Sequence, residues 1–211
     1  MLKLSLLFFL IFFSASASFA GLEQPALVII DMQAAFFTRP ELSQQPANVE
    51  KLRTVLRTQV EAIRLARRAR LPIVVIEYYL PPSGTHISLR HTVPELKGAL
   101  AGYGNVRYFM KYFDGAFDER DGEKVKLLEH LSKSRIKTLI VTGANGRSCV
   151  ASTIEGAVTN GFKIVSFSPG IADFGSTDFI YPYVENPSVE PAWALQKADS
   201  LKELSALVLN R

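Results

Sequence analysis

Cysteine is nearly absent from this sequence, since its 211 residues include only Cys149. A single cysteine cannot form an intramolecular disulfide, so a disulfide-stapled scaffold is excluded and the fold depends on its hydrophobic core. Dense blocks of lysine and arginine with interleaved aromatic residues are also missing. The formal net charge of +4 is therefore weak evidence for nucleic-acid binding, and we predict no nucleic-acid partner. The length suits one domain with a sizeable core.

The N-terminus has the features of an export signal. Lys3 is followed by an apolar stretch from Leu4 to Phe13, interrupted by one serine, and then by small residues up to Ala20. An apolar core of this length is too short to span a bilayer as a helix. We therefore predict a cleavable signal peptide over residues 1–20, a mature domain over residues 21–211, and a secreted or periplasmic location without a stable membrane anchor. An uncleaved N-terminal anchor is the alternative.

Apolar runs alternate with helical periodicity along the rest of the chain. Continuous runs of β-branched and apolar residues are typical of buried strands, and apolar residues at helical spacing are typical of amphipathic helices. This alternation predicts an α/β domain with a parallel sheet. The expected strands cover residues 26–30, 72–79, 106–110, 138–142 and 163–167, and the expected helices cover 48–70, 123–133 and 149–159.

Two further segments are less regular. Residues 80–105 contain several prolines and glycines and are expected to form a long loop. A connection of this length in a compact domain is typical of a lid or a pocket wall. Residues 189–209 are expected to be mostly helical, with an edge strand as the alternative for the last few residues.

Cys149 lies where a strand passes into a helix. The apolar strand before it ends at Gly143, a short polar turn follows, and helical spacing then continues until Asn160-Gly161. At the start of a helix, the free backbone N–H groups and the helix dipole favour an anion, which predicts a lowered pKa for the thiol. The same N–H groups could hold the oxyanion of an acyl-transfer intermediate. The alternative is a small buried hydrophobic residue with no chemical role.

Two other chemically capable residues also follow expected strands. Asp31 comes directly after the first strand, and Lys111 comes directly after the third. Ligands of parallel α/β sheets bind beyond the carboxyl ends of the strands, so an acid, a cation and a thiol are expected at one edge. Taken singly, Asp31 would be a turn residue and Lys111 a solvated surface charge. Their coincidence with Cys149 favours an active site.

Three motifs in this chain resemble the signatures of the isochorismatase-like cysteine hydrolases, the nicotinamidase/isochorismatase superfamily. The first is Asp31-Met32-Gln33-x-x-Phe36 after an apolar strand, and the second is Lys111 with Phe117 six residues on. The third is VTGANGRSCVASTIEGAVTNGFKIV, in which the cysteine opens a helix. The match extends to about Asp173.

The resemblance implies a Rossmann-like three-layer sandwich with a mostly parallel sheet of about six strands. It also implies a catalytic triad of Asp31, Lys111 and Cys149, and a cis peptide bond between Ala144 and Asn145. An oxyanion hole would be formed by the backbone N–H groups of Asn145 and Cys149. The implied substrate pocket contains Gln33, Phe36, Phe117 and Ala144.

The triad suits the cleavage of a C–N bond in a small amide or ureide through a Cys149 thioester. Asp31 would take the thiol proton and Lys111 would stabilise the thiolate. Nicotinamidases carry an Asp-x-His…His metal site after strand two, whereas this chain has Glu77-Tyr78-Tyr79 there, and His86 and His91 lack that spacing. We therefore predict no metal and no cofactor.

Other readings remain open from the sequence. One is vinyl ether hydrolysis of the isochorismatase type, which needs the acid more than the thiol. Another is a binding module that retains the fold without catalysis. Arg147 beside the nucleophile indicates either an anionic substrate or simple exposure at the helix start. The expected partner is a small-molecule substrate, and the sequence does not decide whether the chain forms a homo-oligomer.

Overall fold

The structure, a computed structural model, describes residues 21–34, 46–79, 91–173 and 195–209. The predicted signal segment, Phe36 and His86 lie outside these described residues. The strands are β1 (Pro25–Ile30), β2 (Ile73–Tyr78), β3 (Val106–Lys111), β4 (Thr138–Ala144), β5 (Lys163–Ala172) and β6 (Leu195–Ala198). The helices are α3 (Pro46–Arg68), α4 (Pro94–Leu100), α5 (Glu123–Lys133), the π-helical turn η1 (Gly146–Val150), α6 (Ala151–Thr159) and α8 (Leu201–Leu209).

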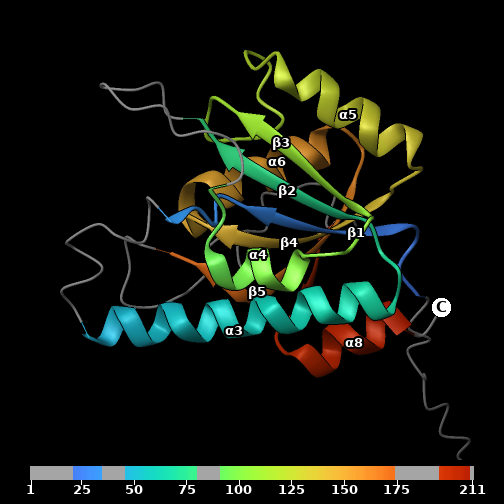
Figure 1. Ribbon diagram of the computed structural model, residues 1–211. Coiled ribbons are helices and arrows are strands. Elements are labelled where there is room, and N and C mark those ends of the chain that lie inside the picture. The colour runs from blue at the N-terminus through green and yellow to red at the C-terminus, as the bar shows by residue number, and fades with distance from the viewer. Residues whose placement is uncertain (1–20, 35–45, 80–90, 174–194, 210–211) are drawn as a thin grey trace, which may run out of the picture.

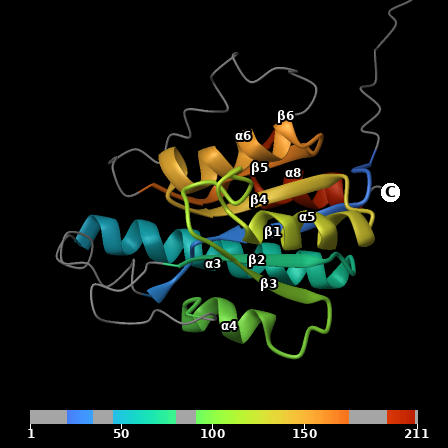
Figure 2. The same cartoon turned by 90° about the horizontal axis from the view of Figure 1, so that it is seen from above.

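The strands form one six-stranded sheet in the order β3-β2-β1-β4-β5-β6, with every neighbouring pair parallel (Figures 1 and 2). The predicted α/β class and the six-stranded parallel sheet are confirmed. The chain runs outward from β1 to β3 and then returns to place β4 on the other side of β1. The crevice at this reversal of strand order is where open α/β sheets bind ligands.

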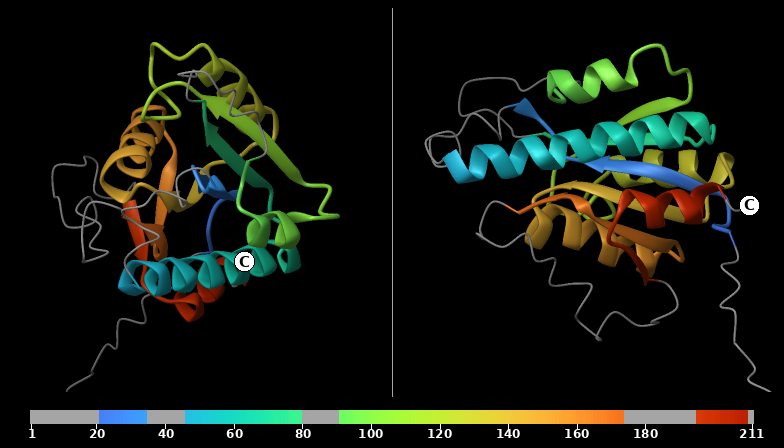
Figure 3. Two further views of the ribbon diagram at one scale, coloured as in Figure 1. Left: turned by 60° about the vertical axis from the view of Figure 1, so that its left-hand side comes forward. Right: turned by 90° about the horizontal axis from the view of Figure 1, so that it is seen from below.

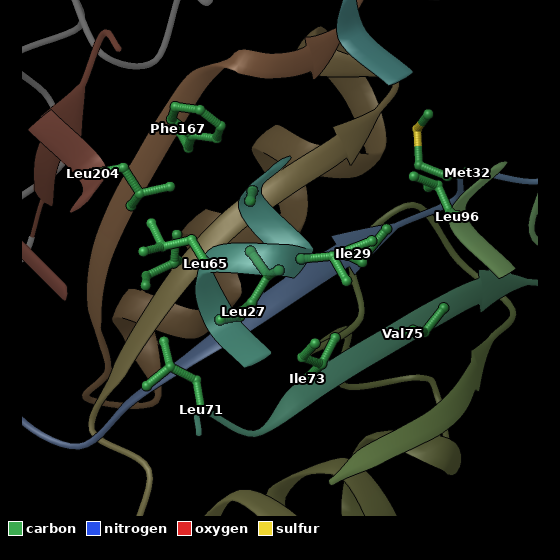
Figure 4. Packing of buried hydrophobic residues seen from close by; sticks show 14 of the residues in the cluster. Leu27, Ile29, Met32, Leu65, Leu71, Ile73, Val75, Leu96, Phe167 and Leu204 are labelled. Carbon is green, nitrogen blue, oxygen red and sulfur yellow. The ribbon is translucent and has the colours of Figure 1, made fainter. Parts of the chain in front are cut away.

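Helices cover both faces of the sheet and give the molecule three layers (Figure 3). Side chains alternate between the faces, so Leu27 and Ile29 of β1 pack on one side while Val28 and Ile30 pack on the other. The first face is covered by α3, α4 and α8, and its packing is shown in Figure 4. The second face is covered by α5 and α6. Central strands buried on both faces explain the unbroken apolar runs in the sequence.

Two segments differ from the sequence predictions. The expected loop over residues 80–105 contains α4, which begins at Pro94, a residue suited to the first position of a helix. In the tail the expected order is reversed, because the edge strand β6 comes first and α8 follows it. Within the described ranges, no helix combines the length and the hydropathy needed to cross a membrane.

Gly143 lets β4 approach β1 closely. It has a φ of 138° and lies beside Ile30 in the register of the two strands. A Cβ atom on Gly143 would lie 2.2 Å from the carbonyl oxygen of Ile30, which is backbone and cannot move aside. The glycine therefore sets the distance between the end of β4 and the end of β1, where Asp31 follows.

Candidate active site

Asp31 is held at the carboxyl end of β1. Its backbone N–H donates to the carbonyl of Ile76 at 2.9 Å, and its φ of 52° turns the chain sharply out of the strand. This left-handed conformation is more accessible to Asp and Asn than to most other residues. Only 2 % of Asp31 is exposed. The carboxylate is therefore buried at the crevice between β1 and β4.

Lys111, the last residue of β3, reaches across β2 to Asp31. Its Nζ lies 2.9 Å from Oδ2 of Asp31, and the lysine is completely buried. The ammonium also donates to the carbonyl oxygens of Phe113, at 3.0 Å, and Asp114, at 2.8 Å. Two carbonyl acceptors and the paired carboxylate thus compensate the charge of the ammonium, which a buried charge requires.

Cys149 lies in η1, the π-helical turn between β4 and α6, and is partly buried. Burial, followed by the negative charge of Asp31, raises the pKa of the Cys149 thiol to about 11, while Lys111 acts in the opposite direction. The lowered thiol pKa predicted from the helix start is therefore wrong for the resting protein. Burial of the sulfur and the charge of Asp31 outweigh the effect of the helix start on the thiol pKa.

The pKa of the Asp31 carboxyl group is shifted as well. Burial raises the pKa of its carboxyl group, while the charge of Lys111 lowers it. The polar side chains that interact with the Asp31 carboxylate are the Lys111 ammonium and the Cys149 thiol. A carboxylate with few donors keeps its basicity, so Asp31 is suited to take a proton from the neighbouring thiol.

The turn that carries Cys149 is anchored on its other side by β5. Asp173, which follows β5, is buried and pairs with Nε of Arg147 at 3.0 Å. Arg147 is therefore held by an acid and is half exposed. The hydroxyl of Ser148 donates to Asp114 at 3.1 Å and lies 4.0 Å from the sulfur of Cys149. The peptide bond between Ala144 and Asn145 is cis, as the motif resemblance implied.

Comparison with known proteins agrees with this architecture. Residues 25–178 match the model of the isochorismatase domain. The chain belongs to the isochorismatase family. None of the curated proteins matches it at a significant level.

Solved structures of other isochorismatase-family proteins have the same fold. A candidate isochorismatase from Burkholderia xenovorans LB400 is 23 % identical, with a TM-score of 0.65 over 89 % of this chain and 88 % of that one. A nicotinamidase from Staphylococcus aureus is 16 % identical, with a TM-score of 0.61 over 85 % of this chain and 100 % of that one. An N-carbamoylsarcosine amidase from Thermoplasma acidophilum is 17 % identical, with a TM-score of 0.56 over 85 % and 99 %. At these identities the likeness shows the fold.

Three of the residues expected to line the substrate pocket of this isochorismatase-family chain are buried, each in a different environment. Gln33 is buried, and both ends of its side-chain amide bond to the backbone of Tyr78. Phe117 is buried against Phe162 and Gly156, with ring centroids 5.8 Å apart in the aromatic pair. Ala144 is buried in the apolar cluster under α3. Contact of these residues with substrate stays a prediction, as does that of Phe36.

Two residues that the sequence did not single out belong to the site. Tyr78 stands opposite Lys111 in the register of β2 and β3, and its ring centroid lies 4.4 Å from the lysine Nζ. Asp173 anchors the turn through Arg147. Tyr78 could have been found from its position at the end of strand two. The pairing of Asp173 with Arg147 could not, because it depends on where β5 ends relative to the turn that carries Cys149.

Among the described residues, no group of three His, Cys, Asp or Glu side chains could hold a metal ion. Glu77, near the end of β2, is buried and accepts hydrogen bonds from the backbone N–H and the hydroxyl of Thr92. Since His86 lies outside the described residues, the metal-free site stays a prediction.

Proposed function

We propose that this isochorismatase-family protein is a cysteine hydrolase that cleaves the C–N bond of a small amide or ureide. The proposal rests on one observation above all: the buried ion pair between Lys111 and Asp31 at 2.9 Å, with the Cys149 thiol facing the same carboxylate. Three strands that are distant in sequence deliver these groups to one edge of the sheet. A buried lysine and aspartate with no chemical role would be costly to keep there.

The first half of the reaction forms a thioester. Asp31 takes the proton of the Cys149 thiol as the sulfur attacks the carbonyl carbon of the substrate. Lys111 stabilises the negative charge that passes between the sulfur and the carboxylate. The oxyanion would be received by the backbone N–H groups of Asn145 and Cys149, the pair implied by the motif resemblance. The C–N bond then breaks, and Asp31 returns the proton to the departing nitrogen.

The second half releases the product. Water takes the place of the amine, and Asp31 accepts a proton from it as the oxygen attacks the thioester carbon. The C–S bond breaks, the product leaves as a carboxylic acid, and the thiol regains its proton from Asp31. The resting state with a protonated thiol and an ionised Asp31 is restored. The raised pKa of the Asp31 carboxyl group suits it to exchange this proton in both halves.

A substrate panel tests the proposal. Purified protein is incubated with small amides, ureides and isochorismate, and the release of ammonia and of pyruvate is measured. We expect ammonia release that is abolished in Cys149→Ala and nearly abolished in Cys149→Ser, because a hydroxyl is much harder to deprotonate than a thiol. Ser148→Ala is the matched control, since this hydroxyl lies 4.0 Å from the sulfur but takes no part in the proposed reaction.

Two outcomes would contradict the proposal. Turnover at the wild-type rate in Cys149→Ala would exclude the thioester. Pyruvate release that depends on Asp31 alone would support vinyl ether hydrolysis of the isochorismatase type. If no member of the panel is turned over but some bind, the binding-module alternative gains support.

We also propose that the protein is exported. The support is the charged start, the apolar stretch and the small residues that end at Ala20. Intact-mass measurement or N-terminal sequencing of secreted or periplasmic material should give Gly21 as the first residue. Retention of Met1 on membrane-bound protein would contradict this.

A further inference from the structure

Four residues at the carboxyl ends of three neighbouring strands form a ring of contacts around the candidate site. Asp31 pairs with Lys111, and the ammonium of Lys111 lies 4.4 Å from the ring centroid of Tyr78. The backbone of Tyr78 is bonded by Gln33, which lies two residues after Asp31. The contacts therefore link the end of β1 to the ends of β2 and β3 and lead back to Asp31, the proposed base.

The position of Tyr78 follows from the reach of Lys111. Since β2 lies between β1 and β3, the lysine side chain must pass over the end of β2, where Tyr78 stands. An ammonium within about 6 Å of an aromatic centroid is attracted by the ring's quadrupole, more strongly when it is desolvated. Burial raises the pKa of Tyr78, so the phenol stays uncharged near neutral pH and acts on Lys111 as a neutral ring.

Gln33 fixes the strand segment that presents this ring. Its Nε2 donates to the carbonyl of Tyr78 at 3.0 Å, and its Oε1 accepts from the Tyr78 N–H at 2.7 Å. Two bonds from one planar amide hold both backbone groups of Tyr78. The glutamine is only 1 % exposed, so water does not compete for these bonds.

We propose that Tyr78 is a positioning residue, which holds the Lys111 ammonium against Asp31 with its ring, and that Gln33 holds Tyr78 in place for this purpose. The catalytic meaning of this role rests on the proposed function, whereas the contact itself does not. The neighbouring Tyr79 offers a matched control. It is also partly buried, and its ring lies against the tilted ring of Tyr112, with centroids 5.1 Å apart, instead of against the lysine.

The first experiment needs no substrate. Proton–nitrogen correlation spectra of the lysine ammonium groups are recorded, and the Lys111 signal is assigned by its loss in Lys111→Met. We expect an upfield ring-current shift and slow hydrogen exchange for this signal in the wild-type protein and in Tyr78→Phe. Tyr78→Leu keeps an apolar cover but has no aromatic face, so the shift should disappear and exchange should accelerate. Tyr79→Leu should leave both unchanged.

Gln33→Met should change the Lys111 signal in the same direction as Tyr78→Leu, and Tyr78→Met serves as the second variant should the leucine variant fold poorly. A Lys111 signal with unchanged shift and exchange in the folded Tyr78→Leu or Tyr78→Met protein would overturn the proposal. These spectra decide the contact even if no substrate is ever found.

The second experiment uses turnover of a substrate from the panel. Loss of a cation–π contact corresponds to about a 2- to 30-fold effect. We expect Tyr78→Leu to lower kcat by about this factor with little change in KM, Tyr78→Phe to restore kcat, and Tyr79→Leu to match the wild type. A raised KM with unchanged kcat in Tyr78→Leu would make Tyr78 a substrate contact and overturn the positioning role. Absence of turnover in the wild type would count against the proposed function alone.

Discussion

Nζ of Lys111 lies 2.9 Å from Oδ2 of Asp31 although β2 separates the two strands that carry them. Neighbouring strands lie about 4.8 Å apart, so the two backbones are separated by about 10 Å and the lysine side chain must be extended. This geometry requires a long side chain with a compact charge. The site therefore exists only when three strands are correctly registered.

Asp31→Asn should make Cys149 more reactive. Burial raises the pKa of the Cys149 thiol most, and the charge of Asp31 raises it further, while Lys111 lowers it and stays in place in the variant. Asparagine also tolerates the left-handed backbone of this position, so the fold should be kept. We expect alkylation by iodoacetamide at pH 8 to accelerate by about tenfold or more, because each unit of pKa gives tenfold more thiolate. Substrate turnover should nevertheless be lost with the base.

Asp114→Asn is the control for this experiment. Asp114 is exposed, and its charge makes the smallest of the contributions that raise the thiol pKa. Its effect on alkylation should therefore be small. Equal alkylation rates for Asp31→Asn and the wild-type protein at pH 8 would show that the carboxylate does not govern the thiol.

Lys111→Met should destabilise the protein most at neutral and higher pH. Removing one partner of a buried ion pair typically costs about 3–5 kcal/mol, because the other charge is left uncompensated. Lys111 lowers the pKa of Asp31, so this pKa should rise further in the variant. A carboxyl group whose pKa is raised by folding stabilises the native state below its unfolded pKa, and this contribution is lost as the pH rises through the folded pKa.

The measurement for this variant is urea unfolding between pH 5 and pH 8. The deficit in unfolding free energy relative to the wild type should shrink as the pH falls. Lys133→Met removes a solvent-exposed partner of Glu129 and should cost no more than about 1 kcal/mol. A deficit for Lys111→Met that is independent of pH would argue against an ionised Asp31.

Gly143→Ala should destabilise the fold and displace the turn that carries Cys149. The new Cβ would meet the backbone of Ile30 at 2.2 Å, in a backbone conformation that alanine rarely adopts. Gly98→Ala is the matched control, because that position in α4 is open and alanine favours a helix by about 0.5–1 kcal/mol. Thermal unfolding should show a marked loss of Tm for the first variant and a small gain for the second.

Extensive chelation should leave turnover unchanged. The chain has Glu77-Tyr78-Tyr79 at the end of the second strand, in place of the Asp-x-His…His pattern. Activity is measured before and after prolonged incubation with EDTA, against a sample incubated without chelator. Loss of activity that zinc, iron or manganese restores would show that His86 or His91 binds a metal.

The sequence predicted the central strands well because a strand buried on both faces is an unbroken apolar run, as in residues 26–30 and 138–142. It failed for α4, where Gly98 and Pro94 suggested a loop although proline is well accommodated at the start of a helix. It failed for the short edge strand β6, whose Gln196 and Lys197 have no apolar pattern.

For the site, the positions of Asp31, Lys111 and Cys149 followed from strand ends, but their electrostatics did not. The pKa of the Cys149 thiol depends on burial and on the carboxylate of Asp31, which lies 118 positions earlier in the chain. The proposed role of Gln33 depends on the hydrogen bonds between its side-chain amide and the backbone of Tyr78. The pairing of β1 with β2 brings these two residues together. Such tertiary contacts leave no local pattern.

The raised pKa of Cys149 also bears on the chemical durability of the protein. Peroxides and electrophiles attack thiolates, and a sulfenic acid is rescued most readily when a second cysteine can form a disulfide with it. This chain has no second cysteine. A thiol with a pKa of about 11 is almost entirely protonated at neutral pH, which makes it a poor target for oxidation. Burial, together with the carboxylate that would accept the proton during turnover, therefore protects the sulfur between turnovers.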